Sequence, residues 1–125
     1  MYSEKLLSRF LEPLHAGEIS SPDGVGEEGN ITCGDVVQLW IKVEDGLISQ
    51  ASFRAQGCAT AIAAADAACE LVLGWTVSAA QTLDIAEVSE LLGGISDDRL
   101  NCATICLGAL RSALDQVRTG SLGKV

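Results

Sequence analysis

The chain has little of several residue types that common enzyme sites require. It has one histidine, His15, among 125 residues, which excludes a histidine-based zinc enzyme site and disfavours a Cys-His nucleophilic dyad. A phosphate-binding loop needs a following helix and a lysine, and the glycines of its Gly-rich segment, Gly24, Gly26 and Gly29, have neither. The sequence therefore offers little to an ordinary hydrolase or to a nucleotide-binding enzyme.

Basic residues and long apolar runs are also scarce. The chain has 8 Lys and Arg against 17 Asp and Glu, a formal net charge of −9, whereas nucleic-acid binders need a concentrated basic surface. No apolar run approaches the length of a membrane span. The first residues show no basic region, extended apolar run or cleavage site typical of a signal peptide. We therefore expect a cytoplasmic protein with no nucleic-acid or membrane partner, whose five cysteines are mostly reduced.

Length and composition indicate one domain over residues 1–125, because 48% hydrophobic residues suffice for an ordinary core. Residues 13–32 are rich in Gly, Ser, Asp and Glu, which predicts a mobile loop leading to the first cysteine, with room for a short strand at 24–26. Residues 120–125 are expected to form a C-terminal tail.

The remaining pattern predicts an α+β fold. Two strand-like runs, 36–43 and 47–55, flank Asp45-Gly46, and this dipeptide favours a tight hairpin. Helical spacing or alanine content predicts four helices, at residues 2–11, 59–75, 84–92 and about 97–118. We expect a small antiparallel sheet of about three strands with the helices packed on one face.

Three cysteines, Cys33, Cys58 and Cys102, are far apart in the sequence and flanked by small residues. The hairpin runs from Cys33 out and back to Cys58, so its open end should bring these two together. Asp35 lies two residues after Cys33, and residues i and i+2 of a strand share a face. Thiolates are ligands for zinc, copper(I) and iron–sulfur clusters. The sequence thus predicts a site of three thiolates and one carboxylate.

Each cysteine alone also has a plainer interpretation as a small buried side chain. Gly34 and Gly57 favour the shared site for the set, because they permit close approach of the backbone. The other two cysteines, Cys69 and Cys106, are expected in the core. A metal bound by Cys102 and Cys106, which are four residues apart, is the less favoured alternative. We expect His15 on the surface.

Five motifs follow one another along nearly the whole chain. They are Met1-Tyr2-Ser3-Glu4-Lys5, Gly24-Val25-Gly26, Cys33-Gly34-Asp35 before a Val-rich strand, Gly57-Cys58-Ala59-Thr60-Ala61-Ile62-Ala63 opening an Ala-rich helix, and Cys102 near the start of the last helix. Each is weak alone, but the ordered set is specific. Through it the chain resembles the iron–sulfur cluster assembly scaffold family, of the IscU and NifU N-terminal-domain type.

The resemblance implies the IscU-like fold and a scaffold rather than an enzyme. Such a protein receives sulfur from a cysteine desulfurase, builds a labile [2Fe–2S] cluster with iron and electrons, and passes it to apo-proteins. Carried onto this sequence, the ligands would be Cys33, Asp35, Cys58 and Cys102. Cys102 would also accept persulfide sulfur, and Asp35 would keep the cluster labile. Members of the family commonly take zinc in the same pocket.

The sequence departs from the family pattern at two places. Asn101 stands where the family usually has histidine, and because an amide is a poor ligand, the fourth ligand falls to Asp35, to an exogenous thiol or to a second subunit of a homodimer. Residues 92–96 lack the prolines of the family's chaperone-recognition segment, which argues against delivery by a dedicated Hsp70 chaperone. We expect the chain to act as a stand-alone scaffold.

Two alternatives to the scaffold stay open at this point. Asn101 favours a zinc-binding or metal-sensing regulatory module that binds the desulfurase without building clusters. A thiol sulfurtransferase that uses Cys102 alone is the other.

Overall fold

The computed structural model describes residues 2–30 and 34–124, with the side chains of all of these except residue 30 and residues 118–124. The strands are β1 (Gly24–Asn30), β2 (Asp35–Glu44) and β3 (Leu47–Gln56). The helices are α1 (Glu4–Leu11), α2 (Ala59–Val72), α3 (Val77–Ala80), α4 (Ile85–Leu91), the 3₁₀ helix η1 (Asp97–Arg99), α5 (Leu100–Ala103) and α6 (Ile105–Lys124). Among the described residues, no helix is both long and apolar enough to cross a membrane.

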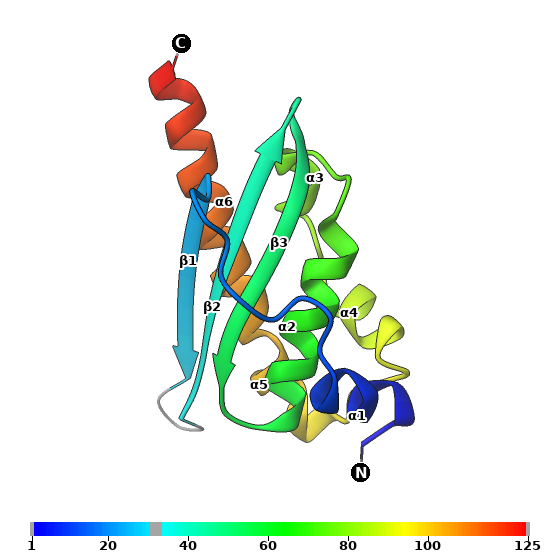
Figure 1. The fold of residues 1–125 in the computed structure, drawn as a ribbon. Coiled ribbons are helices and arrows are strands. Elements are labelled where there is room, and N and C mark those ends of the chain that lie inside the picture. Colours follow the sequence, from blue (N-terminus) through cyan, green and yellow to red (C-terminus); the bar gives the residue numbers. More distant parts are fainter. Residues whose placement is uncertain (1, 31–33, 125) are drawn as a thin grey trace.

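The three strands form one antiparallel sheet in the order β1-β2-β3. Asp45 and Gly46 turn the chain between β2 and β3 with φ values of 55° and 79°, the left-handed conformations that a tight hairpin requires. Helices α2 and α6 cover one face of the sheet, and the segment between α1 and β1 crosses the other face (Figure 1). The predicted α+β class and the predicted hairpin are therefore confirmed.

The core contains many small side chains. Six alanines of α2 are fully buried, together with large apolar residues of the sheet such as Leu39, Ile41 and Phe53. Because alanine adds no bulk beyond Cβ, the α2 backbone can pack closely against the sheet on one side and against α1 on another. An alanine-rich helix is thus central to the core, although no single side chain of it fills much space.

Strand β1 is longer than the sequence predicted. Residues 13–32 were expected to be a loop with room for a short strand at 24–26, but Gly24–Asn30 pairs along its whole length with β2. The reason lies in α6, whose backbone approaches β1 directly. A Cβ built on Gly24 would lie 2.1 Å from the Ala113 carbonyl oxygen, and one on Gly26 would lie 2.1 Å from that of Ala109. Tertiary packing, not strand propensity, therefore selects this strand.

The end of the chain also differs from the expectation. One helix was predicted over residues 97–118 with a tail at 120–125, whereas the structure has η1, α5 and then α6 to Lys124. The interruption lies at Thr104, whose hydroxyl donates a hydrogen bond to the Asn101 carbonyl (2.9 Å). Such bonding of a threonine side chain to its own helix competes with regular helical geometry.

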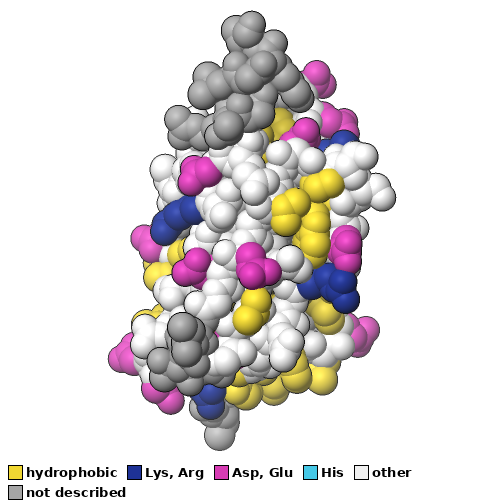
Figure 2. Space-filling view, turned by 90° about the vertical axis from the view of Figure 1, so that its left-hand side faces the viewer, with side chains coloured by type: hydrophobic (Ala, Val, Ile, Leu, Met, Phe, Trp, Pro, Cys, Tyr) yellow, Lys and Arg dark blue, Asp and Glu magenta, His cyan; other side chains and the backbone are white. Residues whose placement is uncertain are grey.

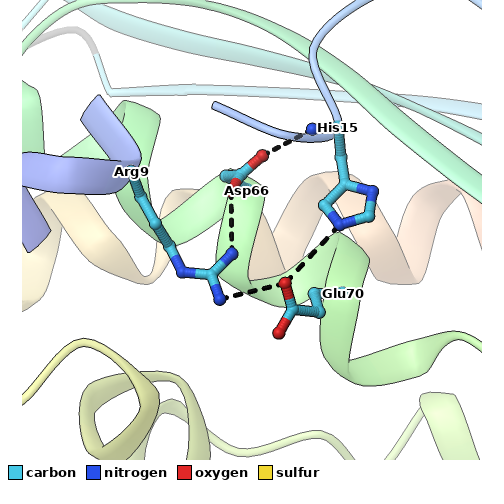
Figure 3. A network of polar contacts seen from close by, with 4 residues as sticks. All are labelled: Arg9, His15, Asp66 and Glu70. Atoms are coloured by element: carbon cyan, nitrogen blue, oxygen red, sulfur yellow. Dashed lines mark hydrogen bonds and ion pairs between the residues drawn. The ribbon is translucent and has the colours of Figure 1, made fainter. Parts of the chain in front are cut away.

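A buried ionic network fixes α1 to α2 (Figure 3). Asp66 of α2 is fully buried; it pairs with Arg9 of α1 (Nη1–Oδ2 2.8 Å) and accepts the backbone N–H of His15 (2.7 Å). Arg9 also pairs with Glu70 (3.0 Å), and His15 Nε2 lies 3.7 Å from the same carboxylate. His15, expected on the surface, is half-buried because this network holds the segment after α1 against α2.

The face that carries β1 and α6 shows the acidic balance of the chain. Acidic side chains are scattered over it, and the few basic ones are separated from one another (Figure 2). Glu27 and Glu28 of β1 are both exposed.

The glycines of β1 give a first prediction. Gly26→Ala should lower the free energy of unfolding by about 1–3 kcal/mol, because the new methyl group collides with the backbone of α6. Gly29→Ala on the same strand is the matched control, since its Cβ would meet its nearest atoms at 3.4 and 3.5 Å; a change within about 0.5 kcal/mol is expected there. Urea titration followed by circular dichroism measures both, and equal losses would contradict the packing argument.

The buried network gives a second prediction. Arg9→Ala should cost about 3 kcal/mol in the free energy of unfolding, because it leaves the Asp66 carboxylate buried without its cation. Arg54→Ala removes an ion pair with Glu18 in which both side chains are more than half exposed, so it should cost less than about 1 kcal/mol. Thermal and chemical unfolding of the two variants side by side test this. A small effect at Arg9 would show that Asp66 needs no partner.

Candidate metal and cluster site

Three ligand-type side chains meet at the end of the sheet where β2 begins and β3 has just ended. They are Asp35, the first residue of β2, Cys58, the N-cap of α2, and Cys102 in α5. One ligand atom from each lies within 4.8 Å of the others. Three residues separated by up to 67 positions in the sequence thus place their ligand atoms around one space. One metal ion could bind all three there after small movements of the side chains.

The convergence of Asp35 and Cys58 follows from the hairpin. Val36 of β2 is paired with Gln56 at the end of β3, so the residue before Val36 and the residues after Gln56 leave the sheet at the same corner. Cys33 was predicted to meet Cys58 there as well. It lies outside the described residues, so its place in the site stays a prediction.

Asp35 is 2% exposed, and its two oxygens have different neighbours. Oδ1 accepts the backbone N–H of Cys58 at 3.0 Å, and Oδ2 lies 3.6 Å from Cys58 Sγ, as acceptor of the thiol. A buried carboxylate needs such donors, because an unpartnered charge in the interior is costly. The aspartate is thus oriented toward the sulfur instead of toward solvent.

Cys58 and Cys102 present their sulfurs in different surroundings. Cys58 is partly exposed at the first turn of the 14-residue helix α2, whose positive end favours negative charge. Cys102 is 6% exposed and lies in the short helix α5. The sequence predicted Cys102 near the start of one long last helix, whereas the break at Thr104 leaves it in the four-residue α5. Among the described residues of the site, α2 is therefore the long helix that presents its N-terminus to the sulfurs.

The glycines beside the cysteines act differently from each other. At Gly57 a Cβ would lie 1.9 Å from Asp35 Oδ1, so the expected close approach is present. At Gly34 no described residue beyond its chain neighbours lies within 4 Å of a built Cβ, and the positive φ of 74° is what favours glycine there. Asn101 is exposed directly before Cys102.

The other two cysteines are in the core, as predicted. Cys69 and Cys106 are at most 1% exposed, and the Cys106 thiol donates a hydrogen bond to the Ala103 carbonyl (3.1 Å). Burial raises the pKa of Cys106 to about 12. It also raises the pKa of Cys69 well above its ordinary value, with the neighbouring Cys106 and Asp66 adding to the effect. Both thiols stay protonated at neutral pH, which makes them poor ligands and poor nucleophiles.

These surroundings predict a clear difference in thiol reactivity. In the native, metal-free protein at pH 8, iodoacetamide should modify Cys58 while Cys69 and Cys106 stay unmodified, because alkylation needs an accessible thiolate. All three should react after unfolding in guanidinium chloride. Peptide mass spectrometry after timed quenching measures each site separately, and early labelling of Cys106 would contradict its burial.

Comparison with known proteins identifies the family of the chain. Residues 1–121 match the family model of the NifU-like N terminal domain. An iron–sulfur cluster assembly scaffold protein IscU of Archaeoglobus fulgidus is 39% identical over 114 residues, which cover 91% of this chain and 74% of that protein. The IscU of Aquifex aeolicus is 35% identical over 115 residues, 90% of this chain and 73% of its own. The nitrogen fixation protein NifU of Azospirillum brasilense is 34% identical over 90% of this chain, which corresponds to 38% of that longer protein.

Solved structures confirm the fold. A putative iron–sulfur cluster assembly scaffold protein for the SUF system from Fervidobacterium islandicum superposes with a TM-score of 0.76 at 22% identity, over 90% of this chain and 96% of that one. The N-terminal part of a NifU-like protein from Brucella abortus gives the same TM-score at 17% identity, over 94% of each chain. Together with the sequence match, this means that the chain belongs to the NifU-like N-terminal domain family.

Proposed function

We propose that this chain is a scaffold on which iron–sulfur clusters are assembled and from which they are transferred to apo-proteins. The observation that carries the proposal is the convergence of Asp35, Cys58 and Cys102 within 4.8 Å. The names of relatives that match about nine-tenths of the chain support it. The cluster is the cargo of this site, and its ligands would be Cys33, Asp35, Cys58 and Cys102.

The donor set suits a cargo that must leave. Thiolates bind iron in [2Fe–2S] clusters firmly, whereas a carboxylate is a hard ligand among soft ones and exchanges more easily. Asp35 is therefore assigned as the ligand that keeps the cluster labile. The site lies at a corner of the sheet, and Cys58 is partly exposed there, so a cluster bound at this corner can be reached from outside the protein.

The proposal includes a route for sulfur. A cysteine desulfurase would present a persulfide, and the Cys102 thiolate would attack its outer sulfur. The S–S bond of the desulfurase breaks, a new S–S bond forms on Cys102, and the desulfurase cysteine leaves as a thiolate. Iron and electrons come from separate donors. On this view the protein is a carrier and not an enzyme, and it works in the cytoplasm.

Asn101 supports a second candidate, a zinc-binding or metal-sensing module that binds the desulfurase without building clusters. Its exposed amide offers no imidazole ligand beside Cys102. Zinc also accepts three thiolates and one carboxylate in a tetrahedral site. With asparagine at position 101, a cluster lacks a fourth ligand unless Asp35, an exogenous thiol or a second subunit of a homodimer supplies it.

Residues 92–96 bear on how a cluster would leave the scaffold. They lack proline, which argues for transfer without a dedicated Hsp70 chaperone.

Anaerobic reconstitution with iron, cysteine and a cysteine desulfurase separates the two candidates. The scaffold should develop the visible absorption of a [2Fe–2S] cluster and activate an apo-ferredoxin on mixing. Cys58→Ala should lower the cluster yield at least about 10-fold, since a thiolate ligand is lost. Cys69→Ala is the matched control, because this core thiol lies in α2, the helix that Cys58 caps, and is outside the proposed ligand set, so the yield should be unchanged.

The opposite result is equally clear. A protein that stays colourless under these conditions and retains stoichiometric zinc would contradict the scaffold and favour the regulatory module. A cluster yield that survives Cys58→Ala would show that the proposed ligand set is wrong.

A further inference from the structure

We infer that Gly57 is a positioning residue for the metal site. Because it has no side chain, it leaves room for the Asp35 carboxylate in the orientation that faces the sulfur ligands. This rests on the proposed function, because it assigns Asp35 to the ligand set. Gly57 has no side-chain donor atom for a metal, so the contribution proposed for it acts through Asp35.

The Asp35 carboxylate occupies the space where a residue 57 side chain would be. A Cβ on Gly57 would lie 1.9 Å from Asp35 Oδ1, 2.6 Å from its Cγ and 3.0 Å from its Cα. The last contact is to a backbone atom of β2, so rotation of the Asp35 side chain alone would not relieve it. Gly57 also has φ +143°, a conformation that other residues rarely adopt. Two separate constraints therefore select glycine.

The two oxygens of the Asp35 carboxylate have different partners. Oδ1 is held by the Cys58 N–H at 3.0 Å, on the side where Gly57 has no Cβ. Oδ2 is left facing Cys58 Sγ at 3.6 Å. A metal between the sulfurs would take Oδ2 while Oδ1 keeps its hydrogen bond. Hydrogen bonds of this kind orient a ligand before the metal arrives, and they raise affinity without touching the ion.

A methyl group at position 57 would force the carboxylate to rotate. The Cys58 N–H would lose its acceptor, and Oδ2 would move away from the sulfurs. The expected result is a site with the same ligands in a poorer arrangement. Changes of this type weaken metal binding by about 10- to 100-fold.

Zinc affinity of the metal-free protein, measured by competition with a chromophoric chelator, tests the inference. Gly57→Ala should weaken zinc binding about 10- to 100-fold. Gly17→Ala is the matched control, because Gly17 has a similar φ of +131° but, in the part of the chain that the structure describes, no atom beyond its chain neighbours within 4 Å of a built Cβ. The zinc affinity of this variant should equal that of the unsubstituted protein. Equal losses in the two variants would overturn the inference, since backbone strain would then account for both.

A double-variant cycle adds a readout that a merely structural role would not move. In an Asp35→Ala background the carboxylate is gone, so adding Gly57→Ala should change zinc affinity by less than about 3-fold. A full additional loss in that background would overturn the inference. If Gly57→Ala alone does not fold, the Asp35→Ala/Gly57→Ala protein should recover the native circular dichroism spectrum, and failure to recover would count against the collision with the carboxylate.

The amide proton of Cys58 reports on the same contact without any metal. Its chemical shift should move upfield in both Gly57→Ala and Asp35→Ala, because each removes the carboxylate acceptor, and stay in place in Gly17→Ala. This measurement separates the positioning role of Gly57 from the proposed function. If the unsubstituted protein binds neither zinc nor a cluster, the proposed function fails, whereas an unchanged Cys58 amide in Gly57→Ala overturns the positioning role itself.

Discussion

The antiparallel pairing of β2 with β3 is the constraint on which the site depends. Its register joins Val36 to Gln56, and this pair decides which residues leave the sheet at one corner. Asp35 enters β2 there, and Gly57 and Cys58 follow β3. A slip of one residue in the register would turn Asp35 to the opposite face of the sheet and away from the sulfur. The chemistry of the corner is therefore set by backbone hydrogen bonds along the hairpin, far from the thiols themselves.

Much of this could be predicted from local sequence. Between two apolar runs, Asp45-Gly46 favours a tight hairpin turn, and the alanine content of the stretch after Cys58 favours a helix. The meeting of Asp35 with Cys58 then follows from the two ends of the hairpin. What could not be predicted depends on partners distant in the sequence. The sequence left room for a short strand at 24–26, but the full strand β1 also depends on α6, whose backbone packs on Gly24 and Gly26, and the local sequence does not indicate that contact.

The site shows the same limit. That Asp35 and Cys58 could share a metal was visible from their spacing, but the role of Gly57 was not, because it depends on the direction of a carboxylate in space. The network of Arg9, His15 and Asp66 was missed for a similar reason. A single aspartate within an alanine-rich helix was the available signal, since a charged residue among buried positions requires a partner. The partner is 57 residues away.

The position of β1 at the edge of the sheet has a consequence for self-association. An edge strand offers unpaired backbone groups to any other chain, a second copy of this protein included. Glu27 and Glu28 are neighbours on this strand, so their side chains leave it on opposite faces. Glu28 lies against Gly108 of α6, where a Cβ would be 2.9 Å from its carboxyl carbon. A copy that paired edge to edge would bring its own two carboxylates against these, and like charges on adjacent strands repel. The edge thus discourages sheet-to-sheet aggregation of the chain with itself, while it remains open to a partner of opposite charge.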